Sequence, residues 1–267
     1  MVFPAREHPL NYIASKLRQD LLDLIYQSGG GHIGGSLSSL DLIIAAYYST
    51  LFNFSAKKSI RDHFVLSAGH LCPGLYVVLA SLGFFDKKLL SSYNSYGSIL
   101  QGHVSIEVPG VEYSSGALGQ GLSFSAGLAI ANPHNTVVCL TSDGEHQEGQ
   151  TWEAAMFAKK YKLGNLINIV DYNGLQIDGT TDQIMPLGNL AAKYIQFGWT
   201  VVSVDGHNFS QIVKALKNAH NSEYPTCIIA KTTLGKGISF MENDFNYHDV
   251  KQLSQDIYLK AKHELIS

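Results

Sequence analysis

The chain has 267 residues, is 45% hydrophobic and carries a net charge of −3. This length fits one domain over residues 1–267 with a full core, and the charge balance argues against a nucleic-acid partner. The three cysteines are widely spaced among apolar residues or beside a proline, which excludes a disulfide framework and a zinc site and indicates reduced thiols in a cytoplasmic protein. The most apolar run, 40–54, is too short for a bilayer span of about 20 residues, and no signal peptide precedes it, so we expect a soluble protein without membrane contact.

The first predicted elements are two helices separated by a glycine-rich stretch. Apolar residues at helical spacing predict a helix over residues 10–25, and Ser38 and Asp41 signal the start of the next. Five glycines surround His32 in the sequence GGGHIGGSLS between them. Glycine costs backbone entropy, so five of them suggest a backbone that approaches something closely. Taken alone, however, the stretch favours a flexible connector with one solvated histidine.

The next segment, DHFVLSAGH, predicts a strand whose end carries His70, followed by a helix from Pro73 to about Gly83. Residues 93–108 include His103 and read as irregular because glycines interrupt every period.

A second glycine-rich segment, GVEYSSGALGQG, precedes a small-residue helix predicted over residues 122–131. Gly116, Gly119 and Gly121 could turn backbone amides toward an anion or a ring. The weaker interpretation is a close packing turn between a helix and the sheet, and a lone pattern of this kind is weak evidence.

Two strands with a helix between them then place polar side chains at equivalent positions. The strand 136–140 runs into Asp143, and after a helix over 151–161 the strand 166–170 leads to Asn173. A right-handed crossover brings both carboxyl ends to one edge of a parallel sheet, so a carboxylate and an amide can meet there. With a backbone carbonyl they would suit Mg²⁺ or Ca²⁺ completed by diphosphate oxygens. Two unrelated turns would explain the same residues, and spacing alone does not decide.

The remaining pattern continues to alternate helices and strands. We predict helices over 187–197 and 209–218 and strands over 199–204 and 225–231, then a glycine-punctuated loop containing His248 and a last helix over 250–264. This alternation predicts an α/β fold with a parallel sheet and helices on both faces.

Four histidines, His32, His70, His103 and His248, all lie in loops or at strand ends. Zinc is one possible explanation, but no two of them share the ligand spacing of a single element. Imidazoles around an apolar cleft would instead bind hydroxyls and phosphate oxygens and move protons near neutral pH.

These segments resemble those of the transketolase family of thiamine diphosphate enzymes along nearly the whole chain. The pair Asp143-Gly144 and Asn173 is similar to the family's GDG…N signature, with Ser142 replacing the first glycine. The resemblance implies a pyrophosphate-binding type of thiamine diphosphate fold, in which Asp143, Asn173 and the Leu175 carbonyl hold the divalent ion.

The resemblance also implies roles for the other residues. Gly144 would approach the diphosphate, and Glu148 would couple to an acid of the partner subunit. His70 and His248 would contact the diphosphate or the substrate. His32 and His103 would contact sugar hydroxyls. The cofactor ring would be lined by Gly116, Leu118 and Ile177. The sequence departs from the family pattern at Ile33, Ala68, Val104 and Asp249, of which Asp249 bears on the geometry of His248 and on acceptor choice.

Transketolases transfer a two-carbon ketol unit from a ketose or ketose phosphate to an aldehyde, and their pyrimidine-binding domain supplies an essential glutamate. We expect that domain on a second polypeptide, most simply in an α2β2 assembly, so that this chain is the N-terminal subunit of a split transketolase. Alternatives are another thiamine diphosphate class, such as deoxyxylulose phosphate synthesis or 2-oxoacid decarboxylation, and a non-catalytic partner-binding subunit.

Overall fold

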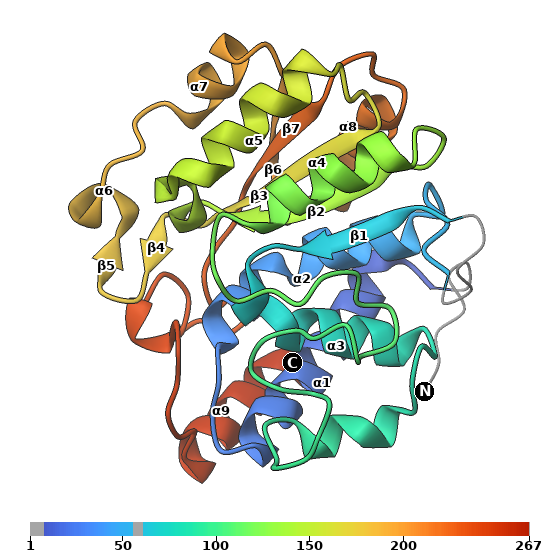
Figure 1. Ribbon diagram of the computed structural model, residues 1–267. Helices are drawn as coiled ribbons and strands as arrows, with labels where there is room; N and C mark the ends of the chain where they lie inside the picture. The colour runs from blue at the N-terminus through green and yellow to red at the C-terminus, as the bar shows by residue number, and fades with distance from the viewer. Residues whose placement is uncertain (1–7, 56–60, 267) are drawn as a thin grey trace.

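Five parallel strands form the central sheet of the computed structural model, which describes residues 8–55 and 61–266 (Figure 1). Their order across the sheet is β1-β2-β3-β7-β6, and every neighbouring pair is parallel. A short antiparallel hairpin, β4 with β5, stands apart from it. The strands are β1 (His63–Leu66), β2 (Val137–Ser142), β3 (Leu166–Tyr172), β4 (Leu175–Gln176), β5 (Gly179–Thr180), β6 (Thr200–Asp205) and β7 (Thr226–Lys231).

Helices cover both faces of this sheet, which confirms the predicted α/β class. Figure 1 shows α4 and α5 on one face, while α2 and α3 lie on the other. The α-helices are α1 (Leu10–Gln27), α2 (Ile33–Tyr48), α3 (Cys72–Ser81), α4 (Gly121–Ala131), α5 (Gly149–Lys160), α6 (Thr181–Ile184), α7 (Leu190–Gln196), α8 (Phe209–His220) and α9 (Gln255–Ile266), and the 3₁₀ turns are η1 (Gly69–Leu71), η2 (Lys87–Ser92), η3 (Gly144–Gln147) and η4 (Phe245–Tyr247).

The two faces form separate apolar clusters because successive strand residues point to opposite sides. In β2, Val138 and Leu140 pack with residues of α1, α2 and α3, whereas Val137 and Cys139 pack with residues of α4 and α5. Strands buried on both faces read as continuous apolar runs, as expected for a parallel sheet.

Helix α2 begins at Ile33, five residues before the predicted start at Ser38, and all of its residues are buried. Tertiary packing overrides the low helix propensity of Gly34 and Gly35. A Cβ at Gly34 would lie 2.6 Å from the Tyr247 carbonyl oxygen, so the absence of a side chain lets the loop after β7 pack on this helix.

The rest of the glycine-rich stretch binds the C-terminal part of the chain. Gly31 and Val250 exchange two backbone hydrogen bonds of 2.7 and 3.0 Å, and a Cβ at Gly30 would overlap the Val250 oxygen. The stretch is therefore not a flexible connector, and the close approach that its glycines allow is to the chain's own backbone. This contact also explains why α9 begins at Gln255 and not at Val250: Val250 forms a bridge with Gly31, and the Leu253 amide donates to the Gly29 carbonyl oxygen.

Other predictions differ from the structure only locally. β1 ends at Leu66, so His70 lies in the following turn η1, and no regular element falls within 93–108 among the described residues. All three cysteines are buried free thiols. None of the helices in the described ranges combines the length and apolar character that a membrane span requires.

Candidate functional site

The carboxyl ends of β2 and β3 lie level with one another and bring Asp143 beside the Asn173 turn. Ser142 is paired with Asp171 in the parallel register, and the Asp143 amide donates to the Asp171 carbonyl oxygen at 3.1 Å. The Asp143 carboxylate is buried and accepts from the backbone amides of Gly144 at 2.8 Å and Gly174 at 2.6 Å. Asp143 therefore contacts the residue that directly follows Asn173.

The environment of Asp143 suits a cation. Burial, followed by the charge of Asp171, raises the pKa of Asp143 to about 7, although two backbone amides favour its ionised form. A divalent ion would remove this cost by pairing with the carboxylate. Within the described ranges no three His, Cys, Asp or Glu side chains lie together as a metal site. The ligand set that the resemblance implies contains only one such side chain, the Asp143 carboxylate, and adds the Asn173 amide oxygen and the Leu175 backbone carbonyl.

A cavity of about 480 Å³ opens at this edge of the sheet, and every site residue predicted from the sequence lines it. Two further atoms in its wall, Gln176 Nε2 and His248 Nδ1, are buried without a hydrogen-bond partner in the described part of the chain. Both could donate to an anionic ligand, so the cavity fits a diphosphate. The predicted residues in its wall are His32, His70, His103, Gly116, Leu118, Asp143, Gly144, Glu148, Asn173, Leu175, Ile177 and His248.

The four histidines form one cluster centred on His32. The centroid of its ring lies 5.3 Å from that of His70 and 5.9 Å from those of His103 and His248. The His70 and His248 rings are stacked with centroids 5.5 Å apart. Loops after four different elements thus deliver imidazoles to the same wall of the cavity.

Burial favours the neutral form of three of these imidazoles, those of His32, His70 and His248. It lowers the pKa of His70 to about 3, with further contributions from His248 and the other two histidines, and lowers that of His248 to about 4. The pKa of His32 is also lowered by burial, and the Asp249 carboxylate, 3.9 Å from its Nδ1, partly offsets this. Neutral imidazoles offer one donor and one acceptor each, which suits hydroxyl and carbonyl groups.

The glycines before α4 divide between two roles. Gly116 faces the cavity beside the His103 ring. The Gly119 amide instead donates to Glu145 at 2.8 Å, and a Cβ at Gly121 would overlap the Ser67 side chain. The packing interpretation therefore holds for Gly119 and Gly121.

Sequence reasoning missed Glu145, which is fully buried in the wall of the cavity. It accepts from the Ser67 hydroxyl at 2.5 Å and from the Gly119 and Ser142 amides, while burial raises its pKa to about 7. Glu145 thus joins the loop before α4 to the ends of β1 and β2. No local pattern indicates this role, since its partner Ser67 lies 78 residues away.

Comparison with known proteins identifies the family. The family described as "Transketolase, thiamine diphosphate binding domain" matches residues 10–264. An apulose-4-phosphate transketolase subunit from Phocaeicola vulgatus is 39% identical over 88% of this chain and 86% of its own length, and the 6-deoxy-6-sulfo-D-fructose transketolase subunit SqwG of a Clostridium species is 40% identical over 96% of both chains. The crystal structure of Campylobacter jejuni transketolase superposes with a TM-score of 0.88 at 31% identity, covering 96% of this chain and 42% of that one.

Proposed function

Because the chain belongs to the transketolase family, we propose that it is the single-domain thiamine diphosphate-binding subunit of a two-chain transketolase. The complex would transfer a two-carbon ketol unit from a ketose, or a ketose phosphate, to an aldehyde acceptor. The observation that carries this proposal is the cavity that joins the Asp143 and Asn173 strand ends to the cluster of four histidines.

The cofactor would lie with its diphosphate over the ends of β2 and β3. Asp143, the Asn173 side-chain oxygen and the Leu175 carbonyl would hold Mg²⁺ or Ca²⁺, and the ion would bind diphosphate oxygens. Gln176 Nε2 and the imidazoles of His70 and His248 would donate to the same anion. When bound, thiamine diphosphate supplies the nucleophilic carbanion and the electron sink for cleavage of the carbon–carbon bond.

The walls of the cavity would orient the rest of the cofactor and the sugar. Gly116, Leu118 and Ile177 provide backbone and apolar surface for the rings of the cofactor. His32 and His103 would hydrogen-bond the donor carbonyl and the sugar hydroxyls. Since the cluster holds its imidazoles close together, it would orient the donor carbonyl and the sugar hydroxyls. It would also exclude bulk water from the reacting carbon.

A second polypeptide would complete the site. Two of the similar proteins are named as subunits, and this chain covers 42% of the transketolase chain with which it superposes. Glu148 is exposed at the cavity, where an acid of the partner chain could approach it. Exposed apolar side chains on α4, on α5 and directly after α5 support a partner surface: Phe124, Ile130, Met156, Phe157 and Tyr161. The simplest assembly of the two chains would be an α2β2 complex, which we place in the cytoplasm.

Reconstitution tests the proposal. The purified chain with Mg²⁺, thiamine diphosphate, a ketose phosphate and an aldehyde should not turn over, and adding the partner chain that carries the pyrimidine domain should give ketol transfer. Asp143→Ala should abolish both turnover and metal-dependent cofactor binding, because it removes the charged ligand of the ion. Activity of this chain alone, or products from pyruvate in place of ketoses, would contradict the proposal.

A further inference from the structure

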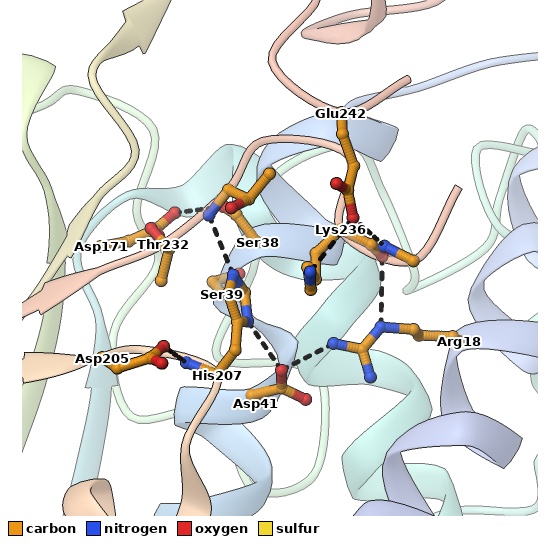
Figure 2. A network of polar contacts seen from close by, with 12 residues as sticks. Arg18, Ser38, Ser39, Asp41, Asp171, Asp205, His207, Thr232, Lys236 and Glu242 are labelled. Carbon is orange, nitrogen blue, oxygen red and sulfur yellow. Dashed lines mark hydrogen bonds and ion pairs between the residues drawn. The ribbon is translucent and has the colours of Figure 1, made fainter. Parts of the chain in front are cut away.

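A buried carboxylate next to the cavity has no role in the function proposed above. Asp171 is the penultimate residue of β3 and is fully buried. Its Oδ2 accepts from the Ser38 hydroxyl at 2.6 Å and from Asn173 Nδ2 at 3.2 Å, and its Oδ1 accepts from the Thr232 hydroxyl. Figure 2 shows Asp171 beside Thr232 and near Ser38.

These contacts determine which end of the Asn173 amide faces the cavity. An ionised carboxylate only accepts hydrogen bonds, so it pairs with the nitrogen end of the amide and not with the oxygen end. Asn173 Nδ2 also lies 3.4 Å from the Ser38 hydroxyl. The oxygen end accepts from the Leu175 amide at 2.9 Å and keeps a second lone pair free for an ion.

The groups around Asp171 are themselves fixed by a longer network (Figure 2). The Thr233 amide, next to Thr232, donates to His207 Nε2 at 2.9 Å, and His207 Nδ1 donates to Asp41 Oδ2 at 2.8 Å. Arg18 binds the same oxygen of Asp41 at 2.6 Å. Asp41 follows Ser38 by one helical turn in α2. The backbone that carries the Ser38 and Thr232 hydroxyls is therefore held by the Arg18–Asp41 ion pair and by the two hydrogen bonds of His207.

We propose that Asp171 is a positioning residue for the divalent cation, because it selects the orientation in which Asn173 presents oxygen, and not nitrogen, to the ion. The inference rests on the proposed function and deepens it. Asp171 does not contact the ion. Its effect is to remove the competing orientation, in which a donor group would face the cation and repel it.

Two neutral substitutions separate this role from a simple loss of charge. Asp171→Asn keeps an oxygen that can still accept from Asn173, since Thr232 can reverse its hydroxyl, whereas Asp171→Leu offers no acceptor. With the full chain and thiamine diphosphate, electron paramagnetic resonance of free Mn²⁺ gives the affinity of each variant. We expect the Leu variant to bind Mn²⁺ about 10–100-fold more weakly than the Asn variant.

A bypass variant provides the matched control. Asn173→Asp places oxygen at both ends of the side chain, so orientation no longer matters and Asp171→Leu should then cost less than about threefold in Mn²⁺ affinity. Equal affinities of the Leu and Asn variants, or the same loss from Asp171→Leu when it is combined with Asn173→Asp, would overturn the inference. Absence of Mn²⁺ binding by the wild type would overturn the proposed function together with it.

A measurement on the wild-type chain covers the case in which the Leu variant does not fold. In protein labelled with ¹³C,¹⁵N-asparagine, Mg²⁺ and cofactor should shift the side-chain carbonyl carbon of Asn173 and leave its NH₂ protons protected from exchange. A shift at the NH₂ group with an unchanged carbonyl carbon would show that nitrogen faces the ion and would overturn the inference.

Discussion

Binding of the divalent ion should release a proton from Asp143, in an amount that depends on pH. The carboxyl is buried next to Asp171, which raises its pKa to about 7, but as a metal ligand it must be ionised. The perturbation is therefore addition of saturating Mg²⁺ to the metal-free full chain. The cofactor is left out because its diphosphate exchanges protons of its own.

The magnitude follows from this pKa. At a pKa of about 7, roughly 0.9 of the Asp143 carboxyls hold a proton at pH 6 and roughly 0.1 at pH 8. Mg²⁺ should thus release about 0.9 proton per chain at pH 6 and about 0.1 at pH 8, and its apparent affinity should fall about tenfold from the higher to the lower pH.

A pH-stat measures this directly, as base consumed per chain after Mg²⁺ is added. Glu145→Gln is the control, because Glu145 also has a pKa raised to about 7 but contacts no ion, so its removal should leave the release unchanged. Release of less than about 0.2 proton per chain at pH 6 would show that Asp143 is ionised before the metal binds and would refute the reasoning.

The same shift has a consequence for stability. The folded-state pKa of Asp143 lies above its ordinary value of 3.8, so the folded, metal-free chain binds more protons than the unfolded chain between about pH 4 and pH 7. The contribution of Asp143 to the free energy of unfolding is fully present below about pH 4 and is lost as the pH rises through about 7. Bound Mg²⁺ should flatten this decline in thermal melts.

Three further predictions concern other parts of the structure. Gly30→Ala should lower the free energy of unfolding by about 1–3 kcal/mol, because its Cβ would overlap the Val250 oxygen, whereas Gly127→Ala on an open face of α4 should raise it by about 0.5–1 kcal/mol in denaturant titrations. Tyr194→Phe should cost about 1–3 kcal/mol in the same titrations, because its hydroxyl is bonded to a buried imidazole and a buried amide, and equal stability would contradict this. Asp249→Asn should lower the pKa of His32 further, which a ¹⁵N NMR titration of the imidazole would detect, and a raised pKa would show that the carboxylate does not act on this ring.

Local sequence patterns predicted most of the sheet and the proximity of Asp143 to the Asn173 turn. Strands that are apolar along their whole length can be recognised in the sequence, and the carboxyl ends of parallel strands must lie at the same edge of the sheet. Hence Asp143 and Asn173 could be placed together without any knowledge of distant contacts. The histidines follow different elements, so their shared loop positions suggested a common cleft but did not establish it, and the resemblance to transketolases carried that prediction.

The missed features depend on partners far away in the chain. The bond from Ser38 to Asp171 joins residues 133 positions apart, and Glu145 meets Ser67 across 78. Helix α2 starts early for the same reason, since its glycines are explained only by the Tyr247 backbone that packs on them. Propensity assigns such residues to loops and turns, and tertiary packing reverses the assignment.

The protonation states at the two ends of the cavity complement one another. In the metal-free chain Asp143 holds a proton at slightly acidic pH, whereas burial and repulsion from neighbouring histidines of the cluster keep His70 and His248 neutral well below pH 7. A cation at Asp143 favours the carboxylate, and an anionic diphosphate beside the imidazoles favours the protonated ring. Metal and diphosphate therefore shift protons in opposite directions in one cavity, so each reduces an electrostatic cost that the other does not. The cation also attracts the anionic diphosphate directly, so binding of both together should be cooperative without any change in the fold.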